Sequence, residues 1–233
     1  MRLFYGLVFL ALLFKQNNIC LPKSSIKSGR LNSIKINKGK MQMAQVIVVH
    51  GYTASPEENW FPWIQEKAQQ EHVSLKVLRL DPSTTPKLEV WEQQMREQID
   101  EIDENSIFIA HSLGCLATLH YLSRELKNQR IRQLVLVAGF NGRLGRLEEV
   151  DPFIDAAQVD FERLKRQIDE RVVIYSEADD RVLPEFSLEQ AESLDTIVIS
   201  AEHQGHFINS QGCTELPEVW RVIEPYLTKI PSD

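Results

Sequence analysis

Ser106-Ile-Phe-Ile-Ala-His-Ser-Leu-Gly114 is the stretch that decides the fold of this chain. Residues 107–110 form a short apolar run with β-branched side chains, which is typical of a buried parallel strand. Apolar positions then recur at helical spacing over residues 113–126. The turn between them, residues 110–114, is close to the G-x-S-x-G nucleophile elbow, in which a strained backbone holds a serine hydroxyl clear of the sheet.

Ser112 has two interpretations at this point. Serine is a favoured helix N-cap, so the residue also fits the start of an ordinary helix. The elbow requires small residues two positions before and after the serine, and Ala110 and Gly114 meet that requirement. The N-terminus of the following helix also aims backbone amides at a developing oxyanion. The strand before and the helix after favour the elbow.

The rest of the chain alternates between strand-like and helix-like segments. Strands are predicted at residues 46–49, 75–80, 131–138, 171–175 and 196–200, and helices at 60–70, 88–102 and 214–227. Such alternation predicts an α/β fold, with a mostly parallel sheet and helices on both faces. No long insertion follows residue 138, so we expect no large lid. Reactive groups are expected at the carboxyl ends of the strands.

Charge is distributed unevenly along the 233 residues, whose net charge is −7. Residues 1–40 hold eight of the 26 Lys and Arg residues and no Asp or Glu. Residues 41–233 therefore carry all 33 acidic residues against 18 basic ones, a net charge of −15. An acidic body argues against nucleic acid as a partner. The three cysteines form no disulfide or metal-binding pattern, and we expect no metal or cofactor.

The N-terminal segment stands apart in composition. Residues 3–14 are a twelve-residue apolar run, which fits a signal-peptide core better than a membrane span. A disordered basic linker follows, so residues 1–43 are interpreted as separate from a domain at 44–233. If the true start is Met41 or Met43, the protein is cytoplasmic. Otherwise it is exported or membrane-anchored, with membrane contact only through residues 3–14.

A serine nucleophile needs a base, and the base needs an acid that orients it. On a sheet of this kind the expected chain order is Ser, then Asp or Glu, then His. Asp179 and Asp180 both follow the fifth predicted strand, and we favour Asp180 because a D-x-x-[VL]-P pattern places a turn and a helix after it. Asp179 is then a cap or turn residue.

Two histidines follow the sixth predicted strand. We favour His206 as the base over His203, because Gly205 gives its backbone freedom and Phe207 is apolar. His111 is expected to point away from the nucleophile into packing.

An oxyanion hole requires two backbone N–H donors. Leu113, directly after the serine, and Tyr52, after the first strand, are the predicted donors. His50 is expected to brace the loop that carries Tyr52.

Apolar side chains around these loops are candidates for an acyl-binding pocket. Trp60, Phe61 and Trp63 either line it or pack on the sheet, and the second role is favoured for Trp63. A small apolar rim is expected from five further residues, namely Phe140, Leu144, Leu147, Phe153 and Ile154.

Together these motifs resemble the small α/β-hydrolase family typified by retinoblastoma-binding protein 9. The likeness rests on His50-Gly51-Tyr52, residues 110–114, Asp179-Asp180-Arg181-Val182-Leu183-Pro184 and Gly205-His206-Phe207, and it runs over residues 45–228. The resemblance implies a compact, lidless α/β-hydrolase domain. It also implies a Ser–Asp–His triad on Ser112, Asp180 and His206, with the acid at the second Asp of the pair.

Two functions are compatible with this sequence. The first is a serine hydrolase that cleaves a carboxylic ester, thioester or amide of a small-molecule or peptide acyl substrate through an acyl-enzyme on Ser112. The second is a protein-binding module that keeps the fold without catalysis. Three intact catalytic groups favour the hydrolase, because a binding module does not need them.

Overall fold

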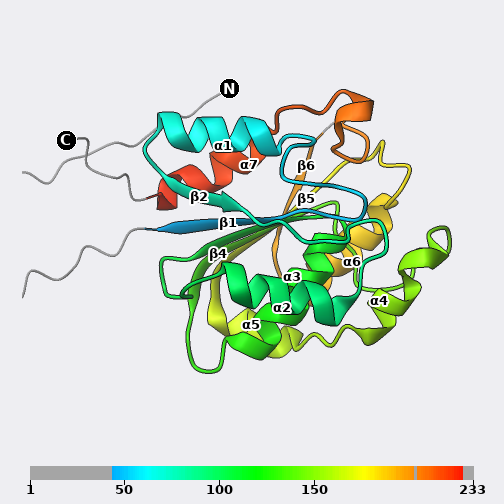
Figure 1. Ribbon diagram of the computed structural model, residues 1–233, viewed down its shortest axis with the longest axis horizontal. Helices are drawn as coiled ribbons and strands as arrows, with labels where there is room; N and C mark the ends of the chain where they lie inside the picture. The colour runs from blue at the N-terminus through cyan, green and yellow to red at the C-terminus, as the bar shows by residue number, and fades with distance from the viewer. Residues whose placement is uncertain (1–43, 202–203, 228–233) are drawn as a thin grey trace, which may run out of the picture. The chain divides into compact units, whose positions relative to one another are not determined.

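The protein is built around a six-stranded, all-parallel sheet (Figure 1). The computed structural model describes residues 44–201 and 204–227. The strands run in the order β2-β1-β3-β4-β5-β6. Their bounds are β1 Gln45–Val49, β2 Ser74–Val77, β3 Ile107–His111, β4 Ile131–Val137, β5 Ile168–Tyr175 and β6 Ile197–Ser200. This arrangement confirms the predicted α/β fold and its largely parallel sheet.

Helices cover both faces of the sheet, as predicted (Figure 1). Helices α1 and α7 pack on one face, and α2 to α6 contribute to the core on the other. Their bounds are α1 Phe61–Gln70, α2 Leu88–Gln98, α3 Leu113–Glu125, α4 Asp151–Ala156, α5 Phe161–Gln167, α6 Pro184–Leu194 and α7 Pro217–Ile223. Three short 3-10 helices complete the described elements: η1 Glu148–Val150, η2 Asn209–Gln211 and η3 Glu224–Tyr226.

The continuous apolar runs of the central strands follow from this double coverage. Successive side chains of a strand point to opposite faces, so Val46 and Val48 join the core under α1 and α7, whereas Ile47 and Val49 join the other core. Both faces are therefore dry, and both need apolar residues. Helix α3 lies in the core on the face covered by α2 to α6, and its residues 113–123 are all buried.

The parallel register brings the strand ends that carry the chemistry to one edge. His111 at the end of β3 lies opposite Val137 of β4, and Val137 lies opposite Ile174 of β5. Tyr175 in turn lies opposite Ser200 of β6. The loops after these strands therefore leave the sheet side by side, which places three distant parts of the chain around one point.

The element boundaries differ from the predictions mainly between β4 and β5. Helices α4 and α5 were not predicted, and β5 begins at Ile168 rather than at Arg171. Both helices are only one or two turns long, too short for a clear apolar period. The segment from β4 to α5 holds only η1 and α4, consistent with a fold without a large lid.

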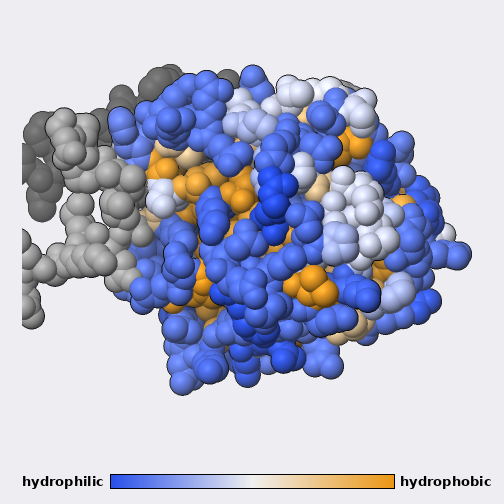
Figure 2. All heavy atoms as spheres, in the orientation of Figure 1, coloured by the Kyte–Doolittle hydropathy of each residue, from blue (hydrophilic) through white to orange (hydrophobic). Residues whose placement is uncertain are grey.

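The predicted N-terminal apolar segment, its basic linker and the boundary at residue 43 lie outside the described residues, as does His203. Within residues 44–201 and 204–227, none of the helices has the length and apolar character that a membrane span requires. Figure 2 shows a mostly hydrophilic surface on the viewed face, with smaller hydrophobic areas between the polar side chains.

Candidate active site

Ser112 occupies the sharp turn between β3 and α3 that the sequence predicts. Its backbone angles are φ 54° and ψ −126°, in a region that costs free energy for a residue with a side chain. A Cβ on Gly114 would lie 2.4 Å from the His50 carbonyl oxygen and 2.7 Å from that of Val49. Only glycine permits this approach of α3 to β1, so the small residue after the serine has a steric cause.

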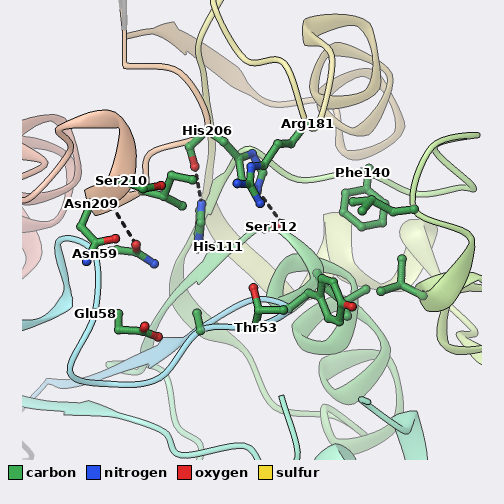
Figure 3. A pocket seen from close by; sticks show the side chains of 16 residues that line it. Thr53, Glu58, Asn59, His111, Ser112, Phe140, Arg181, His206, Asn209 and Ser210 are labelled. Carbon is green, nitrogen blue, oxygen red and sulfur yellow. Dashed lines mark hydrogen bonds between the residues drawn. The ribbon is translucent and has the colours of Figure 1, made fainter. Parts of the chain in front are cut away.

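The imidazole of His206 contacts the Ser112 hydroxyl directly. Its Nε2 lies 3.0 Å from Ser112 Oγ, within hydrogen-bond distance (Figure 3). Its Nδ1 lies 2.8 Å from Oδ2 of Asp179. A neutral imidazole that donates from Nδ1 to the carboxylate leaves Nε2 free to accept the serine proton. The three groups are 8%, 6% and 4% exposed, respectively, so this chain of hydrogen bonds is largely shielded from water.

Asp179, and not Asp180, is the carboxylate that faces the imidazole. The preference for Asp180 is therefore wrong as to geometry. Asp180 is exposed, and its Oδ1 accepts a hydrogen bond from Gln211 Nε2 at 3.1 Å. The placement that the family resemblance implied for the acid is corrected in the same way.

The loop after β5 explains why Asp179 rather than Asp180 faces His206, because the two carboxylate oxygens of Asp179 have different partners. Oδ1 accepts from the amides of Arg181 and Val182 at 2.9 and 3.0 Å, while Oδ2 faces His206. Asp179 is therefore the turn residue that the sequence suggested and the partner of the base at once. The turn fixes the carboxylate, and the neighbouring Asp180 points outward.

Side chains hold the main chain of His206 on both sides. Its N–H donates to Gln211 Oε1 at 2.6 Å, and its carbonyl oxygen lies 2.9 Å from His111 Nε2. The flanking residues Gly205 and Phe207 have φ angles of 55° and 58°. The predicted backbone freedom before the histidine is thus used in a tight turn, which these two side chains brace.

His111 is buried in packing, as predicted, yet it also contacts the base loop. Its ring meets those of Trp60, Phe61 and His206, the last with ring centroids 5.0 Å apart. Burial, followed by the nearby His206, lowers the pKa of His111 to about 3. The ring is therefore neutral at pH 7, and its Nε2–H donates to the His206 carbonyl.

His50 braces the first loop as expected. Its Nδ1 bonds the Gly51 carbonyl at 2.9 Å, and its Nε2 accepts from the Leu80 amide at 3.1 Å. Burial lowers the pKa of His50, which favours this neutral form. Gly51 itself lies close to the elbow, because a Cβ there would come within 2.9 Å of Ser112 Cβ.

The two predicted oxyanion donors lie at the same site. Tyr52 and Leu113 both line the cavity around Ser112, and Leu113 is the first residue of α3. Among the described residues, neither backbone amide has a main-chain hydrogen-bond partner. Unpaired backbone N–H groups suit a negative oxygen, and the helix N-terminus at Leu113 adds a partial positive charge. Their role as oxyanion donors stays a prediction.

A cavity of about 160 Å³ opens over Ser112 and His206. Of the predicted apolar rim, Phe140 and Leu147 line it. The other three residues (Leu144, Phe153 and Ile154) belong to the core. The aromatic residues at 60, 61 and 63 do not line the cavity, since they pack in or against the core under α1 and α7. The cavity also has a polar lining that sequence reasoning missed, namely Thr53, Glu58, Asn59, Arg181, Asn209 and Ser210.

The site residues that the sequence did not reveal lie in segments with weak sequence patterns. Gln211 is exposed and lies five residues after the base, in a loop without a periodic pattern. Glu58 and Asn59 precede α1 in a turn-rich segment, where acidic and amide side chains are common. Within the described ranges, no group of three or more His, Cys, Asp or Glu residues is arranged to hold a metal ion.

Comparison with known proteins agrees with this geometry. A sequence model of the serine hydrolase family matches residues 46–225, a range that contains all three interacting groups. The Bacillus subtilis protein YdeN is 32% identical over 186 residues, covering 79% of this chain and 97% of YdeN. Rat serine hydrolase RBBP9 is 25% identical over 171 residues, covering 72% of this chain and 87% of RBBP9.

Solved structures share the fold. The crystal structure of the Bacillus subtilis ydeN gene product superposes with a TM-score of 0.75 at 31% identity, covering 78% of this chain and 98% of that one. Est1E from Butyrivibrio proteoclasticus, solved with ferulic acid bound, gives a TM-score of 0.58 at 14% identity, covering 79% and 88%. At that identity the likeness concerns the fold alone.

Proposed function

This chain belongs to the serine hydrolase family, and we propose that it cleaves a carboxylic ester through an acyl-enzyme formed on Ser112. The observation that carries the proposal is the continuous path from Ser112 Oγ through the His206 imidazole to Asp179, with contacts of 3.0 and 2.8 Å. A serine hydroxyl is a weak nucleophile until a base takes its proton. This geometry supplies the base and the carboxylate that orients it.

In the first half-reaction, Oγ of Ser112 attacks the ester carbonyl carbon while its proton passes to His206 Nε2. The carbonyl oxygen gains negative charge, which the backbone amides of Tyr52 and Leu113 stabilise in our proposal. The bond to the alcohol oxygen then breaks, and the imidazolium gives its proton to that oxygen. The products of this half are the free alcohol and the acyl-serine.

Water completes the cycle. His206 takes a proton from a water molecule, whose oxygen attacks the acyl carbon, and the bond to Ser112 Oγ breaks as the imidazolium returns the proton to it. Asp179 accepts the Nδ1–H throughout, so it fixes the tautomer and stabilises the imidazolium. The same sequence of steps hydrolyses a thioester or an amide, with sulfur or nitrogen as the leaving atom.

The cavity favours a short or medium acyl chain. Its volume is about 160 Å³, which is small for a substrate site, and Phe140 and Leu147 supply apolar surface. A series of nitrophenyl esters of increasing chain length tests this preference. Highest activity on long chains would contradict it. Methyl ferulate extends the series to an aromatic acid, the class of molecule that Est1E binds.

The proposed reaction is tested with a nitrophenyl ester and a fluorophosphonate probe, using wild type and Ser112→Ala. We expect the wild type to hydrolyse the ester and to take up the probe at Ser112. The variant should lose both, with activity down by about 10⁴-fold or more. A wild type that is folded but neither labels nor turns over esters, thioesters or amides would contradict the proposal and favour a binding module.

A further inference from the structure

The cavity over Ser112 has two chemically different ends. Phe140, Leu147 and Val150, from the segment after β4, give one end apolar side chains. Glu58 and Asn59, together with residues 209–210, make the other end polar. Figure 3 shows Phe140 on the opposite side of Ser112 from Glu58, Asn59 and Asn209. An ester spanning the site therefore meets a different environment on each side of its carbonyl.

The proposed reaction assigns these ends to the two halves of an ester. His206 protonates the leaving oxygen, so the alcohol portion has to lie on the imidazole side of the serine. The polar end is built on that side, because Asn209 and Ser210 follow His206 in the same loop. The Asn209 amide donates to Asn59 Oδ1 at 3.0 Å, which joins the loop after β6 to the segment before α1. The acyl chain then occupies the apolar end.

Glu58 gives the polar end a negative charge. Its side chain lines the cavity and is partly buried, and no other described residue makes an ion pair or hydrogen bond with its carboxylate. The neighbouring Glu57 differs in each respect, because it is exposed, lies outside the cavity lining and pairs with Arg79. A partly shielded carboxylate without a partner favours a cationic ligand more than an exposed one does.

The remaining charges are compatible with a cation at this end. Arg181 also lines the cavity, but its side chain is exposed, so water screens its charge more than that of the partly buried Glu58. The region from residue 41 onward has a net charge of −15, which raises the local concentration of cations around the domain. Both the local carboxylate and the overall field therefore act in the same direction.

We propose that the preferred substrates are esters of amino alcohols, whose ammonium group binds Glu58 while a short apolar acyl chain contacts Phe140 and Leu147. This inference rests on the proposed ester hydrolysis and adds the class of leaving group. Glu58 is a specificity-determining residue in this account. It binds the alcohol portion of the substrate and takes no part in the proton transfers.

Two butyrate esters with the same acyl group test this assignment. One is the choline ester, and the other is its uncharged carbon isostere, the dimethylbutyl ester. We expect wild type to prefer the charged ester in kcat/KM by about fivefold or more, the scale of a partly exposed ion pair. Glu58→Gln should remove this preference, so that kcat/KM becomes similar for the charged and the uncharged ester. Glu57→Gln removes the same charge outside the cavity and should keep the preference.

The outcomes separate this inference from the proposed reaction. If wild type hydrolyses both esters equally well, or if Glu58→Gln keeps the preference, the inference is wrong and the hydrolase assignment stands. Equal loss of the preference in Glu57→Gln and Glu58→Gln would assign it to overall charge, which also overturns a role for Glu58. If neither ester nor any nitrophenyl ester is hydrolysed, the proposed reaction itself fails.

Discussion

The nucleophile elbow and the loops that carry the acid and the base reach the same site by different means. The elbow is fixed by backbone contact within neighbouring elements: β3 ends, Ser112 turns with a positive φ, and Gly114 lets α3 approach β1. The loop of His206 is fixed by hydrogen bonds from two side chains, His111 at the end of β3 and Gln211 five residues further along the chain. Backbone packing determines the first region, and side-chain hydrogen bonds determine the second.

This difference predicts different consequences of substitution. A change in the elbow disturbs the packing of a helix on the central sheet, so it should cost stability. A change in the base loop shifts one side chain relative to another, so it should cost turnover with little effect on folding.

Gly114→Ala should destabilise the protein by about 3 kcal/mol, because the new Cβ would overlap the carbonyl oxygens of His50 and Val49. Urea unfolding measures this loss. Gly142→Ala is the matched control, since a Cβ there meets nothing within 4 Å, and its stability should change by under about 0.5 kcal/mol. Equal stability of the two variants would remove the steric explanation of the elbow.

His111 connects the two regions, and its burial predicts a dependence of stability on pH. Its pKa is about 3 in the folded protein and about 6.5 when unfolded. Below pH 6.5 the unfolded chain takes up a proton that the folded chain refuses, so the free energy of unfolding falls as the pH falls toward 3. Above pH 6.5 this penalty is absent.

His111→Gln keeps an N–H donor that can reach the His206 carbonyl but cannot titrate. Between pH 7 and pH 5 it should therefore lose about 2 kcal/mol less stability than wild type. Urea unfolding at both pH values provides the comparison. Burial also lowers the pKa of His50, but His50 is present in both proteins and contributes equally to both pH profiles. Parallel pH profiles would show that His111 is not held neutral in the fold.

Gln211→Ala should lower kcat roughly tenfold, because it releases the His206 amide and lets the imidazole move relative to Ser112. KM and the urea midpoint should stay close to wild type, since Gln211 is exposed and lies outside the cavity lining. Gln204→Ala in the same loop is the control. A fall in stability without a separate fall in kcat would mean that Gln211 serves only folding.

The sequence predicted what local pattern and topology determine. Ser112 and His206 follow predicted strands, and the chain order of the motif placed them at one edge of the sheet. The short helices α4 and α5 were missed because one or two turns carry little periodicity. The sequence leaves two roles for Trp60 and Phe61, lining the cavity or packing in the core. Only their packing against His111 in the folded protein shows that they belong to the core.

The carboxylate that faces His206 shows most clearly what the sequence alone does not determine. Asp179 and Asp180 are adjacent, and both follow β5, so neither composition nor topology separates them. The choice depends on which side chain caps the turn at Arg181 and Val182, since that residue also faces inward. Asp179 is the turn residue that the sequence suggests, as the structure confirms. The turn role and the contact with His206 are not alternatives, because one oxygen of the carboxylate binds the turn amides and the other faces the imidazole.

A kinetic comparison of Asp179→Asn with Asp180→Asn tests the central claim most directly. We expect Asp179→Asn to lower kcat on a nitrophenyl ester by about 10³- to 10⁴-fold, because an amide cannot stabilise the imidazolium or fix its tautomer. Asp180→Asn should stay within about threefold of wild type. A large loss in Asp180→Asn together with a nearly unchanged Asp179→Asn would contradict the relay from Ser112 through His206 to Asp179.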